Sequence, residues 1–276
     1  MIFEFKLDSI EDVQPWGESP NKQIHWFALT QGIYRLKVGD EYLLNYSNEF
    51  TAQISEKFPN IRYRGTFVDY YIVRLWEDLI DILPHILEPV PKELQHFLES
   101  DYKIQRDWSE KVADWHDKAE LSKVLNNDEI WEICENATDW INNRCLDSGY
   151  LSPSANIWIW SDENDMIISW DNQEIMVDGI QVWSATRSSY RINRNEFVLE
   201  LKRFDNQLFS EMAGRVNEIC KTWNNEEIYI DFEQLKSEQN NRATWMKSWV
   251  DSKHKTDWRK VIEAVNNVYE NLLSRN

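Results

Sequence analysis

Glycine, cysteine, positive charge and long apolar runs are all scarce in this chain of 276 residues. Its 7 glycines fall well below the roughly 7% share typical of proteins, which favours helices over glycine-lined phosphate loops. The sequence has no P-loop, dinucleotide fingerprint, zinc-protease motif or nucleophile elbow, so the enzyme classes that carry them lose support. The apolar runs span only a few residues, far fewer than the roughly 20 that cross a bilayer, and we expect no membrane segment.

The three cysteines, Cys134, Cys145 and Cys220, are odd in number and include no C-x-x-C pair. This spacing argues against a disulfide framework and against a structural zinc site, and it is typical of a reducing compartment. The first residues, Met1–Asp8, alternate like a strand and lack the basic flank and apolar core of a signal peptide. We therefore expect a cytoplasmic protein that holds no metal and no cofactor.

Tryptophan and negative charge are what the chain has in excess. It holds 15 tryptophans, and 48 Asp and Glu residues against 30 Lys and Arg residues give a net charge of −18. Residues 77–101 and 101–150 each carry a net charge of −6, whereas the chain from residue 242 onward carries +3. Because an acidic surface repels nucleic acid and attracts basic proteins, the composition predicts a protein partner and no direct nucleic-acid binding.

The first third of the chain reads as strands. The aromatic run His25–Thr30 is followed by Ile33–Val38 and Glu41–Tyr46, which Gly39-Asp40 separates. A two-residue Gly-Asp turn is typical of a tight hairpin, and it would place Leu36 opposite Leu43.

A second strand region begins at Ile157–Trp160 and returns as Met166–Trp170. A turn centred on Glu163-Asn164 places Trp158 and Trp160 on one face and leaves apolar residues on the other face as well. Such a hairpin either lies centrally in a covered sheet or presents one face to a partner. Ile180–Thr186 and Ser188–Ile192 also read as strands.

Apolar residues at three- and four-residue spacing predict helices in the rest of the chain. The order of strands, helices, strands and helices indicates an α+β fold, with antiparallel aromatic-rich sheets packed against amphipathic helices and a helical C-terminus. We expect one α+β domain over residues 1–230 and a helical extension over residues 231–276. The predicted helices cover Phe67–Ile86 with Pro84 disturbing the last turn, Lys92–Ser100, a stripe from Trp108 to Ala119, another from Ile130 to Cys145, Phe197–Trp223, and the chain from Thr256.

Several segments in the first 220 residues are distinctive in sequence. They include Val13-Gln14-Pro15-Trp16-Gly17, His25–Gly32, Arg74–Leu79, Leu146–Leu151 and Phe204–Met212. In these segments the chain resembles an uncharacterised bacterial family known only as a domain of unknown function. The resemblance implies a bacterial cytoplasmic protein, and it transfers no activity.

Three histidine-containing patterns could in principle form a site. Glu93 and His96 form one E-x-x-H, but a di-metal carboxylate site needs two copies, so we interpret the pair as solvated. His116 and Glu120 lie one turn apart among further acids and fit the polar face of an amphipathic helix. His25 has no identifiable nucleophile or acidic orienter and reads as a packed histidine rather than a general base. We assign no catalytic residue.

The function we expect is partner binding, specifically that of an immunity protein that neutralises a basic bacterial toxin. Carboxylates would speed capture of such a partner, and aromatic anchors would slow its release. The oligomeric state is not predicted. The residues expected to bind the partner are Asp78, Asp81, Glu88, Glu93, Glu99, Trp158, Trp160 and Trp170.

Two alternatives stay open. One is an enzyme or small-ligand-binding protein whose pocket is lined by Trp26, Trp158, Trp160 and Trp170, because aromatic side chains often line concave sites. The same four residues would equally well fill a core. The other alternative is a DNA mimic or antiphage-related protein, in which carboxylates would imitate phosphates.

Overall fold

The computed structural model describes residues 2–59, 65–99, 101–250 and 255–270. It has an α+β fold with antiparallel sheets, as predicted. The chain divides into two compact units, which we call unit 1 and unit 2. Unit 1 comprises Met1–Leu83, Glu174–Ala185 and Asn195–Ser252, and unit 2 comprises Pro84–Gln173, Thr186–Arg194 and Lys253–Asn276. The boundary expected at residue 231 does not coincide with this division.

Unit 1 is built on a four-stranded sheet in which β2 (Gln31–Val38) is central. β2 pairs antiparallel with all three of the other strands. The predicted hairpin is confirmed, because Leu36 lies opposite Leu43, and Gly39 turns the chain with φ +61°. The other strands are β1 (Phe3–Leu7), β3 (Glu41–Leu43) and β4 (Val68–Tyr71), and a separate ribbon joins β7 (Met176–Val177) to β8 (Ile180–Gln181).

Two predictions in this region are wrong. His25–Thr30 forms a tight turn and a 3-10 helix (Ala28–Thr30), because the Leu29 N–H donates to the His25 carbonyl (3.3 Å) and the Thr30 hydroxyl to the Phe27 carbonyl (2.7 Å). The predicted helix from Phe67 begins only at Ile72, with α2 (Ile72–Ile86), because the preceding four residues pair with β2. Pro84 lies inside α2.

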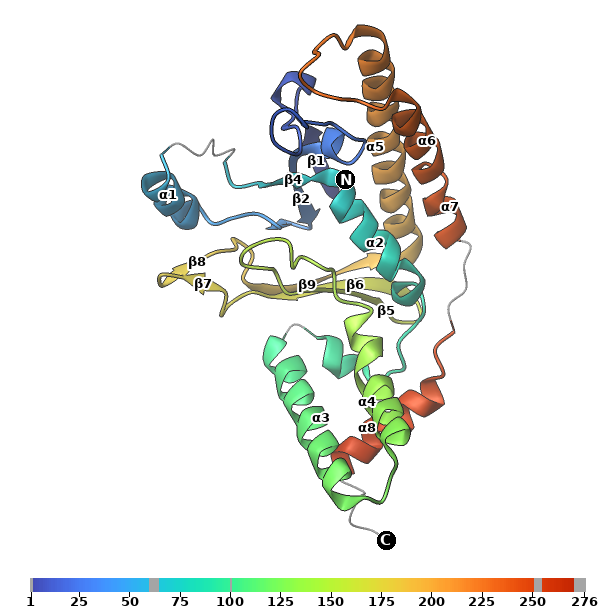
Figure 1. Ribbon diagram of the computed structural model, residues 1–276. Helices are drawn as coiled ribbons and strands as arrows, with labels where there is room; N and C mark the ends of the chain where they lie inside the picture. The colour runs from blue at the N-terminus through green and yellow to red at the C-terminus, as the bar shows by residue number, and fades with distance from the viewer. Residues whose placement is uncertain (1, 60–64, 100, 251–254, 271–276) are drawn as a thin grey trace. The chain divides into compact units, whose positions relative to one another are not determined.

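The helices of unit 1 include α5 (Arg194–Thr222), of which all but Arg194 lies in the unit, and α6 (Phe232–Arg242) beside it (Figure 1). α5 follows the predicted apolar stripe. α6 lies in the region for which we expect a helical extension, and it begins directly after Asp231, whose carboxylate accepts the Glu233 and Gln234 N–H groups. The remaining helices are α1 (Asn48–Lys57), most of α2 and α7 (Trp245–Val250).

Unit 2 contains a three-stranded antiparallel sheet of β5 (Ile157–Ser161), β6 (Asp165–Asp171) and β9 (Arg187–Asn193). The predicted hairpin register is confirmed, with Trp158 opposite Ser169 and Trp160 opposite Ile167. Every residue of β5 is buried. Of the two alternatives predicted for this hairpin, the structure therefore shows the one in which both faces are covered.

Three helices build the rest of unit 2: α3 (Tyr102–Ser122), α4 (Asn127–Asn142) and α8 (Trp258–Glu270). α3 and α4 form an antiparallel pair that α8 contacts (Figure 1). α4 begins with a capping box between Asn126 and Glu129. The predicted helix over Lys92–Ser100 is instead a short 3-10 helix, Gln95–Leu98, and Ser100 lies outside the described residues.

Candidate functional site

Most of the tryptophans belong to the core. Trp158, Trp160 and Trp170, which we expected to contact a partner, are only 4%, 3% and 2% exposed. They are inaccessible because both faces of the β5–β6 hairpin are covered, so the expected docking surface cannot include their rings. The buried tryptophans are Trp26, Trp76, Trp108, Trp115, Trp140, Trp158, Trp160, Trp170 and Trp183.

The five carboxylates expected to attract a partner lie in both units. In unit 1, Asp78 is buried and its Oδ1 lies 3.0 Å from the Arg74 guanidinium, whereas Asp81 is exposed. In unit 2, Glu93 and Glu99 are exposed. Asp78 therefore serves an internal ion pair, and so, as described next, does Glu88.

A buried cation organises one end of α4 in unit 2. Arg144 is fully buried, its Nη1 donates to the Trp140 carbonyl (2.7 Å), and its Nη2 lies 3.7 Å from Glu88 Oε2. Glu88 in turn accepts from the Thr256 backbone N–H (2.8 Å) and hydroxyl (2.5 Å). Burial lowers the pKa of Arg144 to about 10, although Glu88 opposes the shift, so the guanidinium stays charged at neutral pH. Sequence patterns gave no sign of this cluster.

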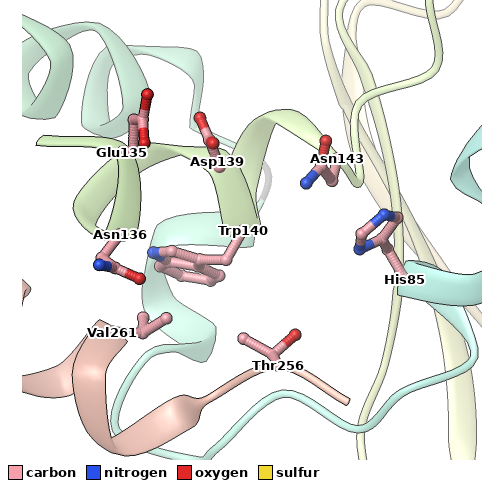
Figure 2. A pocket seen from close by; sticks show the side chains of 8 residues that line it. All are labelled: His85, Glu135, Asn136, Asp139, Trp140, Asn143, Thr256 and Val261. Carbon is pink, nitrogen blue, oxygen red and sulfur yellow. The ribbon is translucent and has the colours of Figure 1, made fainter. Parts of the chain in front are cut away.

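A cavity of about 230 Å³, the Trp140 cavity, lies between α4 and the start of α8. Figure 2 shows the Trp140 indole pointing toward Val261 and Thr256, while Glu135 and Asp139 extend on the other side of the helix. Burial raises the pKa of Asp139, and the nearby Glu135 adds to the shift. The cavity is lined by His85, Glu135, Asn136, Asp139, Trp140, Asn143, Thr256 and Val261.

A larger cavity of about 310 Å³, the Trp158 cavity, lies between α3 and α4 and reaches β5. Trp158 is thus the one tryptophan of the predicted aromatic pocket that lines either cavity, since Trp26, Trp160 and Trp170 line neither. The lining residues are Tyr102, Gln105, Arg106, Trp108, Ser109, Glu110, Thr138, Ile141, Asn142, Cys145, Asn156 and Trp158.

The far end of the α3–α4 pair exposes large apolar side chains. Leu121 is 83% exposed, Val124 in the connection is 53% exposed, and Trp131 is 55% exposed. The Trp131 ring lies 5.1 Å from the His116 ring, whose Nε2 is 3.8 Å from Glu120 Oε1. We call this region the hairpin surface; it comprises His116, Asp117, Glu120, Leu121, Val124 and Trp131.

No three His, Cys, Asp or Glu side chains among the described residues lie close enough together to hold a metal ion. His25 packs against Trp16 (4.1 Å between ring centroids), and burial lowers its pKa, although Glu238 opposes the shift. Burial raises the pKa of Cys145 to about 11, and Asp147 adds to the shift, so this thiol stays protonated.

No helix in the part of the chain that the structure describes is long and apolar enough to cross a membrane. Comparison with the curated proteins found no match, and comparison with the solved structures found none either. The family comparison did find one, and its match extends over residues 2–264, well past the residue 220 at which we placed the end of the resemblance. The chain belongs to the family of unknown function DUF5984.

Proposed function

We propose that the protein binds a basic protein partner through the hairpin surface, in the manner of an immunity protein that neutralises a toxin. The proposal is carried by one observation: the indole of Trp131 is 55% exposed and packs on the ring of His116, which Asp117 and Glu120 flank at the end of the α3–α4 pair. It replaces the buried Trp158, Trp160 and Trp170 with Trp131 as the aromatic anchor.

The exposures of Leu121, Val124 and Trp131 are large for apolar residues. Single exposed apolar side chains are ordinary, but tryptophan is among the residues that most often anchor a binding surface. A partner that covers Trp131 would remove most of an indole from water. That burial is the kind of contribution that slows dissociation.

The charge around these residues favours a basic partner. Between Glu110 and Glu132 the chain has seven acids and three bases. Asp117 and Glu120 flank the imidazole of His116 and are themselves largely exposed, at 80% and 51% of their side chains. Opposite charges on a partner would speed encounter, and the association rate should then fall as salt is added.

Co-expression with the product of a neighbouring gene tests the proposal. We expect a complex with a basic neighbour, rescue from any toxicity that it causes, and at least a tenfold loss of affinity on Trp131→Ala, as for an interface anchor. Tyr229→Ala is the matched control, because Tyr229 is a 65% exposed aromatic residue of unit 1.

Two outcomes would overturn the proposal. The first is the absence of any complex and any rescue. The second is a complex that Trp131→Ala and Tyr229→Ala weaken equally, because the partner would then not dock on the hairpin surface. Circular dichroism of both variants would establish that they are folded.

A further inference from the structure

We propose that the Trp158 cavity binds a small uncharged ligand with a flat heterocyclic ring of the nucleobase type. This inference does not depend on the proposed partner binding, because the hairpin surface and the cavity share no residue. It rests on the size of the cavity, its walls, its polar groups and its charge.

Size distinguishes the Trp158 cavity from the Trp140 cavity. Small-molecule sites occupy roughly 300–1,000 Å³. At about 310 Å³ the Trp158 cavity reaches that range, whereas the Trp140 cavity, at about 230 Å³, falls below it. The space between helices is also a common position for ligand sites in helical bundles.

Part of the lining of the Trp158 cavity is aromatic or aliphatic. Trp108 and Ile141 come from α3 and α4, and Trp158 comes from β5. The Tyr102 ring stacks near Trp158, with 6.1 Å between centroids and 29° between planes. Aromatic and aliphatic walls of this kind suit the two faces of a planar ring.

Polar groups with unused hydrogen-bonding capacity lie beside these walls. The Ser109 hydroxyl donates to the Gln105 carbonyl and the Thr138 hydroxyl to the Cys134 carbonyl, so each oxygen can still accept a bond. Asn156 uses its Nδ2 on the Asp171 carbonyl (3.1 Å), which leaves its Oδ1 as an acceptor. A ligand edge that carries both N–H donors and acceptors would match this set.

Gln105 adds an independent observation. It is 6% exposed, and its Nε2 donates to the Phe97 carbonyl and to the Glu99 carbonyl, while its Oε1 is buried without a hydrogen-bond partner in the structure described. An unpaired buried acceptor is destabilising. A ligand N–H that reached this oxygen would relieve the penalty.

The charges that line the cavity argue for an uncharged ligand. Arg106 and Glu110 stand one turn apart on α3 with opposite signs, and the other lining side chains are neutral. The Cys145 thiol is protonated at neutral pH, so no thiolate is available to bind a metal or attack an electrophile. The site is therefore suited to reversible binding.

Titration with adenosine, guanosine, cytidine and uridine, followed by thermal unfolding and calorimetry, tests the proposal. We expect at least one nucleoside to bind saturably and to raise Tm by about 5 °C at a hundredfold excess over Kd. Glucose serves as the non-planar comparison ligand. Absence of saturable binding by all four nucleosides, or binding of glucose alone, would overturn the proposal.

Two asparagine variants locate the ligand. Asn142 is an exposed residue of α4 that lines the Trp158 cavity, and Asn136 on the same helix lines the Trp140 cavity. We expect Asn142→Ala to weaken nucleoside binding about tenfold and Asn136→Ala to leave the affinity unchanged. Equal affinities in the two variants, or a loss on Asn136→Ala alone, would show that the ligand does not occupy the Trp158 cavity.

Discussion

Among the described residues, buried indole N–H groups that lack a hydrogen-bond partner occur in unit 2 and not in unit 1. In unit 1, Trp26 Nε1 donates to Gln239 Oε1 (2.8 Å), and Trp76 Nε1 donates to Asp205 Oδ1 (3.0 Å). In unit 2, Trp115 Nε1 and Trp160 Nε1 are buried and have no hydrogen-bond partner in the structure described. Unit 2 also pairs indoles, because Trp108 Nε1 and Trp140 Nε1 both donate to the Ala137 carbonyl (3.0 and 3.2 Å), so the units differ in their unused donors and not in every tryptophan.

Buried polar atoms without a hydrogen-bond partner are found in both units, as at Gln53 Oε1 in unit 1, but they are more numerous among the described residues of unit 2. Gln239 of unit 1 also donates to the Phe209 carbonyl (3.0 Å), so one amide ties Trp26 and α6 to α5. Unit 2 buries Arg144 with Nε unpaired, and it holds both cavities and the hairpin surface. Incomplete satisfaction of buried groups is often found where a structure serves binding.

Breaking the buried ion pair of unit 2 should have the largest effect. Glu88→Gln removes the negative charge near Arg144 and weakens the acceptor of Thr256, so we expect a loss of about 3 kcal/mol in the free energy of unfolding. Urea unfolding measures this loss. Glu93→Gln, an exposed acid of the same unit, should change stability by less than about 0.5 kcal/mol. Similar values for both variants would contradict the structural role of Glu88.

Substituting one tryptophan of each unit by phenylalanine tests the comparison directly. Trp26→Phe leaves Gln239 Oε1 without its donor, whereas Trp160→Phe removes an N–H that has no partner. We expect Trp26→Phe to be the more destabilising by about 1–3 kcal/mol. If chemical denaturation gives equal losses, the hydrogen bond of Trp26 does not distinguish the units.

The pH dependence of stability offers a smaller effect. Burial raises the pKa of Asp205, although the Trp76 N–H opposes the shift. An acid with a raised folded-state pKa binds more protons when folded, so its contribution is largest in acid and declines as the pH rises through that pKa. Asp205→Asn keeps an oxygen for Trp76 and cannot ionise. It should gain stability relative to the parent from about pH 4 upward, the ordinary range of carboxyl titration.

Unfolding curves of the parent and Asp205→Asn between pH 3 and pH 7 measure this difference. Asp139→Asn is the counterpart in unit 2, where burial and Glu135 raise the pKa of Asp139, and the difference should have the same sign. A variant of Asp205 that is less stable than the parent at neutral pH would refute the prediction.

The smallest effect is expected at the hairpin surface. Trp131→Ala should change the free energy of unfolding by less than about 0.5 kcal/mol, because the indole is 55% exposed. Thermal unfolding checks this value. A large loss of stability would mean that Trp131 contributes to the packing of α3 against α4 and is not available as a binding residue.

Local periodicity predicted much of the fold. The stripes of α3, α4 and α5 and the two hairpin registers depend on neighbours within a few residues, so the sequence carries them. α6 was not among the individual helices predicted, because only two of its residues, Leu235 and Gln239, are buried, and they form no apolar stripe. The turn at His25–Thr30 was predicted wrongly, because a short aromatic run is equally compatible with a strand.

The candidate sites were less predictable than the fold. Glu88 and Thr256, which are 168 residues apart, meet beside Arg144, and no local pattern encodes such a pairing. The sequence indicated the hairpin surface only as an acidic helix face that contains His116 and Glu120. The exposure of Trp131 depends on tertiary packing, which no local pattern encodes. Composition shows the surplus of tryptophan, but it does not determine which indole rings are exposed to solvent.

The interleaving of the two units bears on synthesis of the chain. Unit 1 includes residues 195–252 and unit 2 takes α8 from residues 258–270, so neither unit is complete until the chain beyond residue 194 has been made. α8, which contacts α3 and α4, follows every other element of unit 2 in the sequence. An arrest of translation before α8 would therefore leave the apolar faces of α3 and α4 uncovered, a state that chaperones would be expected to recognise.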